Sequence, residues 1–213
     1  MALNINGTTG ISGVDGSVSA PALTGTDSNT GITFPSADTI KFSTGGVERL
    51  SITNSGISGI TAGITEMDNW RLNTAYTASG INYVTSNWER NDTTFEKIGT
   101  GLTESSGIFS FPSTGKYLIL WQMSWTSSNP SNYVGGYIRV TTDGSNYTRR
   151  AENFDDLQAN GANGAVNVML VVDIENISTH KVRFETEAQA SNTLRADTGR
   201  NVTGVIFIKL GET

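Results

Sequence analysis

The sequence predicts an all-β protein whose larger part is a β-sandwich or jelly roll. Apolar and polar residues alternate in many short runs, and no segment shows a convincing helical period. Turn-forming residues are abundant, with 24 Gly among 213 residues. About eight to ten strand-like runs follow residue 65, and short strands joined by polar turns are typical of a sandwich or jelly roll.

Composition argues against several classes of function. The formal net charge is −6 and only 16% of residues are charged. We therefore expect no nucleic-acid partner, because affinity for phosphates depends on Lys and Arg. No run of about 18 apolar residues occurs, so we expect no membrane span. The start of the chain, MALNINGTTG, lacks a basic stretch followed by an apolar core, so we expect no signal peptide.

The composition changes near residue 65, and we expect three segments. All four Trp and all six Tyr lie after that point. Residues 1–25 are predicted to be an extended arm, with a run of Gly triplets that is too short for a stable collagen helix. Residues 26–65 are predicted to be a shaft, and residues 66–213 a head domain.

The shaft prediction depends on a loose repeat of apolar–polar–apolar triplets. These are Ile32–Phe34, Ile40–Phe42 and Leu50–Ile52, separated by polar turns. Short strands at a regular spacing are typical of fibrous proteins. Each triplet has a narrow apolar stripe with nothing in its own chain to cover it, and three copies around an axis would bury these stripes together. We therefore expect a short trimeric β shaft; the alternative is a flexible linker, which would avoid the entropy cost of ordering.

The stretch 105–125 is predicted to be the core of the head. Two phenylalanines flank a serine in a short strand, and a Pro–Ser–Thr–Gly turn leads into a longer strand with aromatic residues on one face. We expect the two strands to form a hairpin. Leu118 and Leu120 make the longer strand apolar on both faces, which predicts the middle of a closed or two-layer sheet. The expected core residues are Phe109, Phe111, Pro112, Gly115, Tyr117 and Trp121.

Other strands are expected along the head. They cover residues 67–73, 85–90, 133–142, 145–150, 165–174, 181–188 and 202–210. Asp143–Gly144 is a strong signal for a hairpin turn. Trp70 and Trp88 lie inside strand-like runs, and we interpret them as core residues; a sugar-binding surface is the alternative.

Polar segments between the strands are the expected contact loops, because loops on a rigid sandwich often carry recognition. They cover residues 76–84, 127–133, 155–164 and 191–200. The candidate contact residues are Tyr76, Tyr133, Asp155, Asp156, Asn160, Arg195 and Arg200.

We expect no enzyme activity and no cofactor, catalytic residue or metal-binding residue. The single histidine, His180, lies in a segment typical of a turn before a strand. Glu185 and Glu187 share one face of a strand, which indicates a solvated outer face and not an acid pair across a cleft. With no Cys and one His, the usual zinc ligand sets are missing. Loop carboxylates and amides match no defined calcium spacing, and calcium binding stays open.

One motif resembles a known superfamily. Gly107–Tyr117, GIFSFPSTGKY, is similar to the G-x-F-x-x-P-x-x-G-x-Y signature of complement globular heads and tumour-necrosis-factor-like proteins. Thr203–Leu210 is similar to the closing strand of that superfamily. The resemblance covers residues 66–210 and implies a ten-stranded jelly roll. It also implies a homotrimer, since members of the superfamily pack their heads around a threefold axis.

The whole layout resembles fibre-type structural proteins of tailed bacteriophages. The segments that carry this resemblance are Met1–Gly7, Ile40–Ile52, Asn69–Leu72, Asn87–Arg90 and Ser105–Phe109. It implies that residues 1–25 anchor the chain to phage capsid or tail proteins, after assembly in the host cytoplasm. The head would then decorate the virion or adhere to a host-surface glycan or protein. Head or tail attachment is left open. A secreted carbohydrate-binding or signalling module and a polysaccharide depolymerase are the alternatives.

Overall fold

The structure is a computed structural model that describes residues 4–6, 10–12, 15–59 and 63–213. It divides into two compact units, residues 1–63 and 64–213. The described residues form strands and no helix, which confirms the all-β prediction. None of them therefore belongs to a helix able to cross a membrane. Parts of the predicted arm, at 1–3, 7–9 and 13–14, lie outside the described residues.

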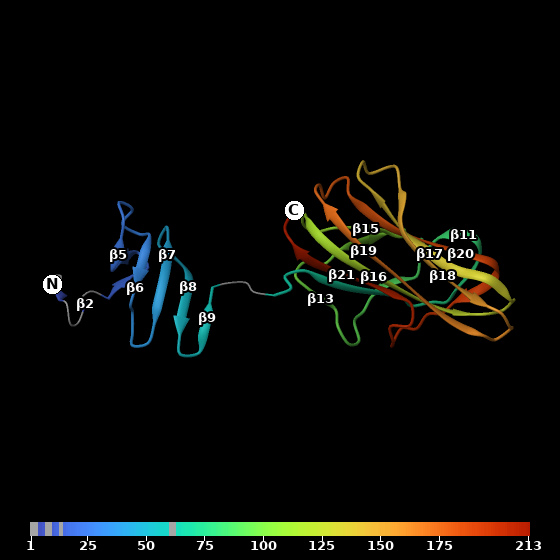
Figure 1. The fold of residues 1–213 in the computed structure, drawn as a ribbon, viewed down its shortest axis with the longest axis horizontal. Coiled ribbons are helices and arrows are strands. Elements are labelled where there is room, and N and C mark those ends of the chain that lie inside the picture. Colours follow the sequence, from blue (N-terminus) through green and yellow to red (C-terminus); the bar gives the residue numbers. More distant parts are fainter. Residues whose placement is uncertain (1–3, 7–9, 13–14, 60–62) are drawn as a thin grey trace. The chain divides into compact units, whose positions relative to one another are not determined.

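The first unit is built around a five-stranded antiparallel sheet, whose strands lie side by side in Figure 1. Its strands are β5 (Leu23–Thr24), β6 (Gly31–Thr33), β7 (Ile40–Thr44), β8 (Val47–Thr53) and β9 (Gly56–Ser58). Two small pairs precede it, β1 (Asn4–Asn6) with β2 (Gly10–Ser12) and β3 (Gly16–Ser17) with β4 (Ala20–Pro21). The predicted triplets fall on β6, β7 and β8, with Phe34 just beyond the end of β6.

Strand register places the apolar residues of these triplets on one face of the sheet. Two cross-strand rows form, Ile32–Phe42–Leu50 and Ile40–Ile52–Ile57. The rows share a face because residues two apart in a strand point to the same side. Ile57 is 64% exposed and Ile40 is 38% exposed. We call this surface the shaft face; the other described residues of the first unit leave much of it uncovered.

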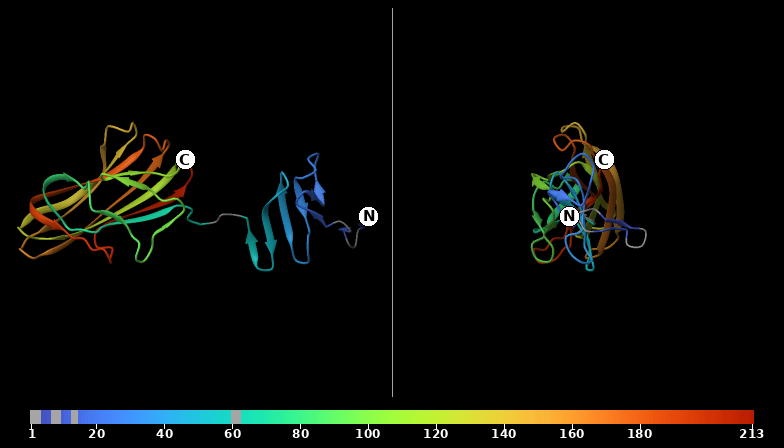
Figure 2. Two further views of the ribbon diagram at one scale, coloured as in Figure 1. Left: turned by 180° about the vertical axis from the view of Figure 1, so that it is seen from behind. Right: turned by 90° about the vertical axis from the view of Figure 1, so that its left-hand side faces the viewer.

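The head contains twelve strands in two facing layers that can be followed from both sides in Figures 1 and 2. The first layer has β12 (Trp88–Arg90), β10 (Met67–Leu72), β21 (Gly204–Gly211), β16 (Gly115–Thr126) and β19 (Asn163–Ile174), with β13 (Lys97–Ile98) beside β10. The second has β14 (Thr103–Ser105), β15 (Ile108–Ser110), β20 (Lys181–Leu194), β17 (Ser131–Thr141) and β18 (Thr148–Leu157), with β11 (Tyr76–Tyr83) beside β20. Pairing of β16 with β20 at Trp125 and Leu194 joins the layers into a nearly closed sandwich.

The predicted hairpin at 105–125 is wrong, although both of its strands exist. β15 pairs with β14 and β20, whereas β16 pairs with β19 and β21. The turn between them carries the chain from one layer to the other. Gly115 begins β16 with φ of 137°, and a Cβ there would meet the Gly211 carbonyl oxygen. A turn that permits this backbone reverses the chain equally well within a layer or between layers, so turn chemistry alone did not distinguish the two.

Aromatic side chains fill the space between the layers. Phe109, from the second layer, packs edge-on against Trp70 at 5.5 Å and against Trp88 at 5.2 Å between ring centroids. It also contacts Phe184 at 5.5 Å and Phe207 at 5.3 Å. Trp70 is 8% exposed and Trp88 is 9% exposed, which confirms that both belong to the core. Such ring pairs stabilise a core beyond the area they bury.

Several predicted loops are strands. Tyr76 begins β11, Tyr133 lies in β17, and Asp155 and Asp156 lie near the end of β18. β20 continues to Leu194, into the segment predicted as the last contact loop. These strands are polar because one face of each strand points outward or because the strand lies at the edge of the sheet. Their backbones form ladder hydrogen bonds whether or not the side chains are polar. Asn160, Arg195 and Arg200 do lie outside strands.

We predict that Phe111→Ala lowers the free energy of unfolding of the head by about 3–5 kcal/mol, the usual cost of truncating a large core side chain. Phe111 is 4% exposed and packs against Tyr117 with ring centroids 4.7 Å apart. All four Trp lie in the head, so Trp fluorescence during urea unfolding reports on it alone. Ile81→Ala is the control, because Ile81 is 56% exposed. Equal midpoints for both variants would contradict the prediction.

Candidate functional site

Most of the candidate contact residues lie at one end of the head. The loop with Arg200 begins there and runs back along the first layer, where Asn201 Nδ2 donates to Asn69 Oδ1 at 3.2 Å. The chain enters the head near Glu66 and leaves it alongside, where the Lys209 amide donates to the Glu66 carbonyl at 2.9 Å. At the opposite end, Tyr76 of β11 pairs with Leu194 of β20. The Ser127 amide donates there to the Ala162 carbonyl at 2.8 Å. We call this the distal end; it comprises residues 73–76, 127–133, 155–162 and 195–203.

Asn192 organises the distal end from inside. It is fully buried and its Oδ1 accepts hydrogen bonds from the amides of Ser128 at 2.9 Å and Asn129 at 3.2 Å. Its Nδ2 donates to Ser131 Oγ at 2.6 Å. One side chain thus fixes the turn between β16 and β17. A turn held in this way is pre-organised for binding, which reduces the ordering cost of a contact.

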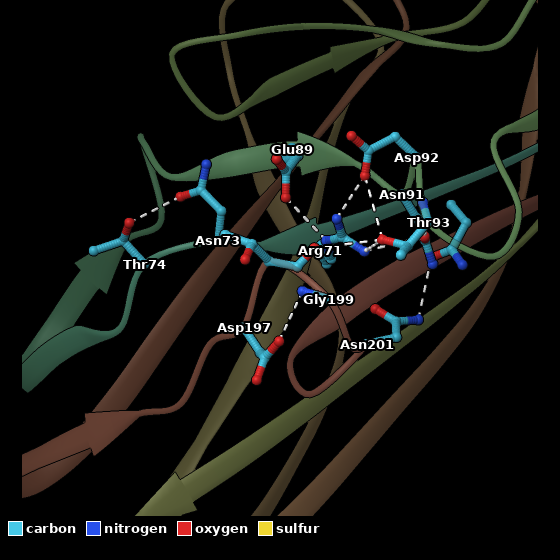
Figure 3. A network of polar contacts seen from close by, with 12 residues as sticks. Arg71, Asn73, Thr74, Glu89, Asn91, Asp92, Thr93, Asp197, Gly199 and Asn201 are labelled. Atoms are coloured by element: carbon cyan, nitrogen blue, oxygen red, sulfur yellow. Dashed lines mark hydrogen bonds and ion pairs between the residues drawn. The ribbon is translucent and has the colours of Figure 1, made fainter.

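A second polar network surrounds Arg71 of β10 (Figure 3). Arg71 is 1% exposed. Its Nε donates to Glu89 Oε2 at 2.9 Å, and its Nη2 donates to Asp92 Oδ1 at 2.7 Å. Its Nη1 donates to Asn91 Oδ1 at 3.1 Å and to Thr93 Oγ1 at 2.8 Å. The guanidinium therefore fixes the loop after β12 against the first layer.

The Arg71 network extends to the distal loop before β21. Thr93 Oγ1 donates to the Thr198 carbonyl at 3.4 Å. The Asp197 amide donates to the Leu72 carbonyl at 3.1 Å, and Asp197 Oδ1 accepts from the Gly199 amide at 2.7 Å. A hydrogen bond from Arg200 to Asp197 holds the pKa of that carboxyl below its usual value. The loop that carries Arg195 and Arg200 is therefore held by hydrogen bonds to Leu72 and Thr93 and by those that Asp197 accepts within the loop.

The outer side of the second layer carries arginine, tyrosine and glutamate side chains. The expectation that Glu185 lies on a solvated face is wrong, because it is 1% exposed. The arginines at 139 and 149 cover it, with the Nε atoms of Arg139 and Arg149 each 2.8 Å from its carboxylate. Arg183 stacks between two tyrosines, with its Cζ 3.7 Å from the ring centroid of Tyr83 and 4.0 Å from that of Tyr147.

Beside this cluster lies a hollow of about 210 Å³ that we call the aromatic hollow. It is lined by Tyr133, Tyr137, Phe154 and Glu187. The ring of Phe154 meets those of Tyr133 and Tyr137 at 82° and 69°. The Tyr137 hydroxyl donates to Glu187 Oε2 at 2.6 Å. Burial, and then this hydrogen bond, raise the pKa of Tyr137 to about 12.

The outer side of the first layer is apolar. Leu118 and Leu120 lie on it, half-buried, and their strand β16 lies in the middle of a layer of the two-layer sandwich, as expected. Two cross-strand rows form, Met67–Ile208–Leu118–Val171 and Asn69–Ile206–Leu120–Met169. Met169 is 69% exposed and Val171 is 57% exposed. We call this surface the outer apolar face; a hollow of about 240 Å³ opens in it beside Met169.

The remaining predicted residues occupy structural positions. Phe109, Tyr117 and Trp121 are at most 1% exposed, and Pro112 is half-buried in the turn between layers. His180 is 7% exposed in the turn before β20, where its amide donates to the Asn176 carbonyl at 2.8 Å. Among the described residues, no group of three His, Cys, Asp or Glu side chains is placed to hold a metal ion.

Comparison with solved structures identifies the fold of the head. Eiger TNF from S. frugiperda matches with a TM-score of 0.54 and 10% identity over 69% of this chain and 93% of that chain. Murine APRIL at pH 5.0 matches with a TM-score of 0.51 and 14% identity over 68% of this chain and 98% of that chain. PRD1 vertex protein P5 matches at 15% identity over 70% and 100%, but its TM-score of 0.43 is too low to carry an argument. The head thus has a TNF-like jelly-roll fold. No family model and no curated protein sequence matches the chain.

We predict that Arg71→Met lowers the free energy of unfolding by about 3 kcal/mol, the lower end of the range for breaking a buried ion pair. The lower end applies because the side chain of Asp92 is 72% exposed and stays hydrated. Arg200→Met is the matched control, since the Arg200 side chain is 76% exposed and pairs only at the surface. Urea unfolding of both variants measures the difference. An Arg71 variant as stable as the Arg200 variant would show that the network does not stabilise the head.

Proposed function

We propose that this chain is a non-enzymatic, homotrimeric virion structural protein of a tailed bacteriophage. In this proposal it is a fibre or a capsid or tail appendage, anchored by residues 1–25, and its head adheres to the host surface or decorates the particle. One observation carries the proposal: both units expose an apolar sheet face, the shaft face and the outer apolar face. The layout of the sequence, which resembles phage fibre proteins, supports the virion role.

The two apolar faces support contact between copies of the same chain. Met169 and Val171 in the head, and Ile57 in the shaft, are each more than half exposed, although they belong to regular strands. A monomeric soluble protein rarely leaves such contiguous apolar rows open to water. Covering them gains roughly 25 cal/mol for each Å² of apolar surface removed from water. Three copies related by a rotation would bury one face of each in a closed ring.

The polar side chains support a binding role and not catalysis. Of the three groups considered for acid–base chemistry, Glu185 pairs with two arginines and His180 is buried in a turn. The third, Glu187, accepts a hydrogen bond from the Tyr137 hydroxyl. The distal end, by contrast, presents loops that are fixed by Asn192 and the Arg71 network. Three rigid heads on one particle would multiply weak contacts with a host surface.

We predict that the full chain is a trimer and that charges on the apolar faces dissociate it. Met169→Asp in the head combined with Ile52→Asp in the shaft places a carboxylate in each face, so burial would require desolvating it. Sedimentation velocity at micromolar concentration should show a trimer for the original chain and a monomer for the double variant. Ile81→Asp, an exposed apolar position on the other layer, should remain trimeric. A monomeric original chain would refute self-association, and a trimeric double variant would exclude these two faces.

We predict that a chain lacking residues 1–25 remains a folded trimer but no longer incorporates into particles. Purified particles carrying a tag at Thr213 can be imaged by electron microscopy for both versions. Label on particles made with the full chain, and none with the shortened chain, is the expected result. Equal labelling would show that the arm is not the anchor, and unlabelled particles in both cases would contradict the virion role.

A further inference from the structure

The aromatic hollow is lined by aromatic rings and a carboxylate, which are groups that bind cations. The rings of Tyr133 and Phe154 lie with centroids 6.2 Å apart and planes at 82°. They therefore form two walls of a corner, not a flat platform. Tyr137 adds a third ring 5.3 Å from Phe154, and Glu187 completes the lining with a carboxylate. Aromatic rings attract cations through the negative charge of their faces.

Carboxylates and one arginine surround the hollow. Arg139 and Arg149 are both paired with Glu185. Arg149 also stacks on Tyr137, with its Cζ 3.5 Å from the ring centroid, so it covers one face of that ring and leaves the corner between Tyr133 and Phe154 as the place for a ligand cation. Glu187 takes part in no ion pair among the described residues and accepts only the Tyr137 hydroxyl. Glu152, which lies opposite Tyr137 in the register of β18, is exposed and forms no ion pair among the same residues. Two carboxylates thus flank the ring-lined corner.

The lining discriminates between ligand classes. A sugar ring needs a flat aromatic surface together with hydrogen-bond donors and acceptors. The lining side chains provide carboxylate and phenol oxygens but no N–H donor, and the rings stand nearly perpendicular. An alkylated ammonium group needs no hydrogen-bond donor from the protein, because its methyl groups contact ring faces and its charge faces the carboxylate.

We propose that the aromatic hollow binds a quaternary ammonium group, such as the trimethylammonium end of choline, between Tyr133 and Phe154 with Glu187 as the counter-ion. The site lies within one head, so the proposal does not depend on the virion role or on the trimer. It names a ligand class for this surface. Of the residues that line the hollow, only Tyr133 was a candidate contact residue in the sequence.

The test compares choline chloride with 3,3-dimethyl-1-butanol, its uncharged isostere, against the full chain. Ligand-observed saturation-transfer NMR detects weak binding irrespective of protein size, and titration gives the affinity. We expect choline to bind about tenfold more tightly than the isostere, which corresponds to about 1.4 kcal/mol. The strongest transfer should reach the N-methyl protons. Methyl glucoside, the third probe, should not bind.

Variants assign the binding to the hollow. We expect Tyr133→Ala and Glu187→Gln each to weaken choline binding by about tenfold. Tyr133→Phe keeps the ring and should keep the affinity. Glu175→Gln, which removes an exposed carboxylate in the turn after β19, is the control for charge and should change nothing. Unchanged unfolding midpoints would confirm that each variant is folded.

Three outcomes would overturn the proposal. Equal binding of choline and its isostere would mean that the hollow recognises only apolar bulk. Binding of methyl glucoside without choline would assign the hollow to a glycan. Choline binding that survives both Tyr133→Ala and Glu187→Gln would place the cation elsewhere on the chain.

Discussion

The packing of Phe109 between the two layers is the contact on which the head depends. Its ring meets Trp70, Trp88, Phe184 and Phe207, which come from four different strands of the two layers. Side chains alternate along a strand, so fixing these inward residues also fixes which residues point outward. The core therefore does more than stabilise the fold. It determines which side chains the surfaces of the head present.

The outward residues of the two layers differ in chemistry. On the first layer they form apolar rows through Leu118 and Leu120, which end near the buried guanidinium of Arg71. On the second layer they form stacks of arginine with tyrosine around the carboxylate of Glu185. An apolar surface gains free energy when it is covered, whereas the arginine–tyrosine surface is already satisfied within its own chain. The first layer is thus suited to permanent contact, and the second can stay in water.

Alternation of apolar and polar residues predicted many strands of the head, because it reflects one covered face, but it missed β11, which was predicted as a loop. Residues 165–174 and 181–188 lie in β19 and β20, and the Asp143–Gly144 signal lies in the turn between β17 and β18. Connectivity between the layers was not predictable. The turn before Gly115 has the same residues whether the chain stays in a sheet or leaves it. The strand that follows could therefore be identified, but not its partners.

The candidate site was the least predictable part, because its groups are distant in sequence. Glu185 is buried only because Arg139 and Arg149 cover it, and no local pattern links residues 36 and 46 positions apart. Arg71 is similar, since its partners come from β12 and the loop after it, 18 or more positions later in the chain. Tyr133 was named for its loop-like surroundings, yet it acts as part of a strand. A polar strand whose outer side chains meet only after folding resembles a loop in the sequence.

The separation of the two surfaces has a consequence for binding. Self-association through the outer apolar face would use the first layer and leave the second layer, with its aromatic hollow, open to solvent. Each trimer would then present three copies of the hollow near the distal ends of its heads. A single contact between a small cation and a few rings is weak, but linked sites act at a raised effective concentration. An assembly of this kind would bind a surface that carries many ammonium groups more tightly than a free ammonium compound, because the free compound engages only one site.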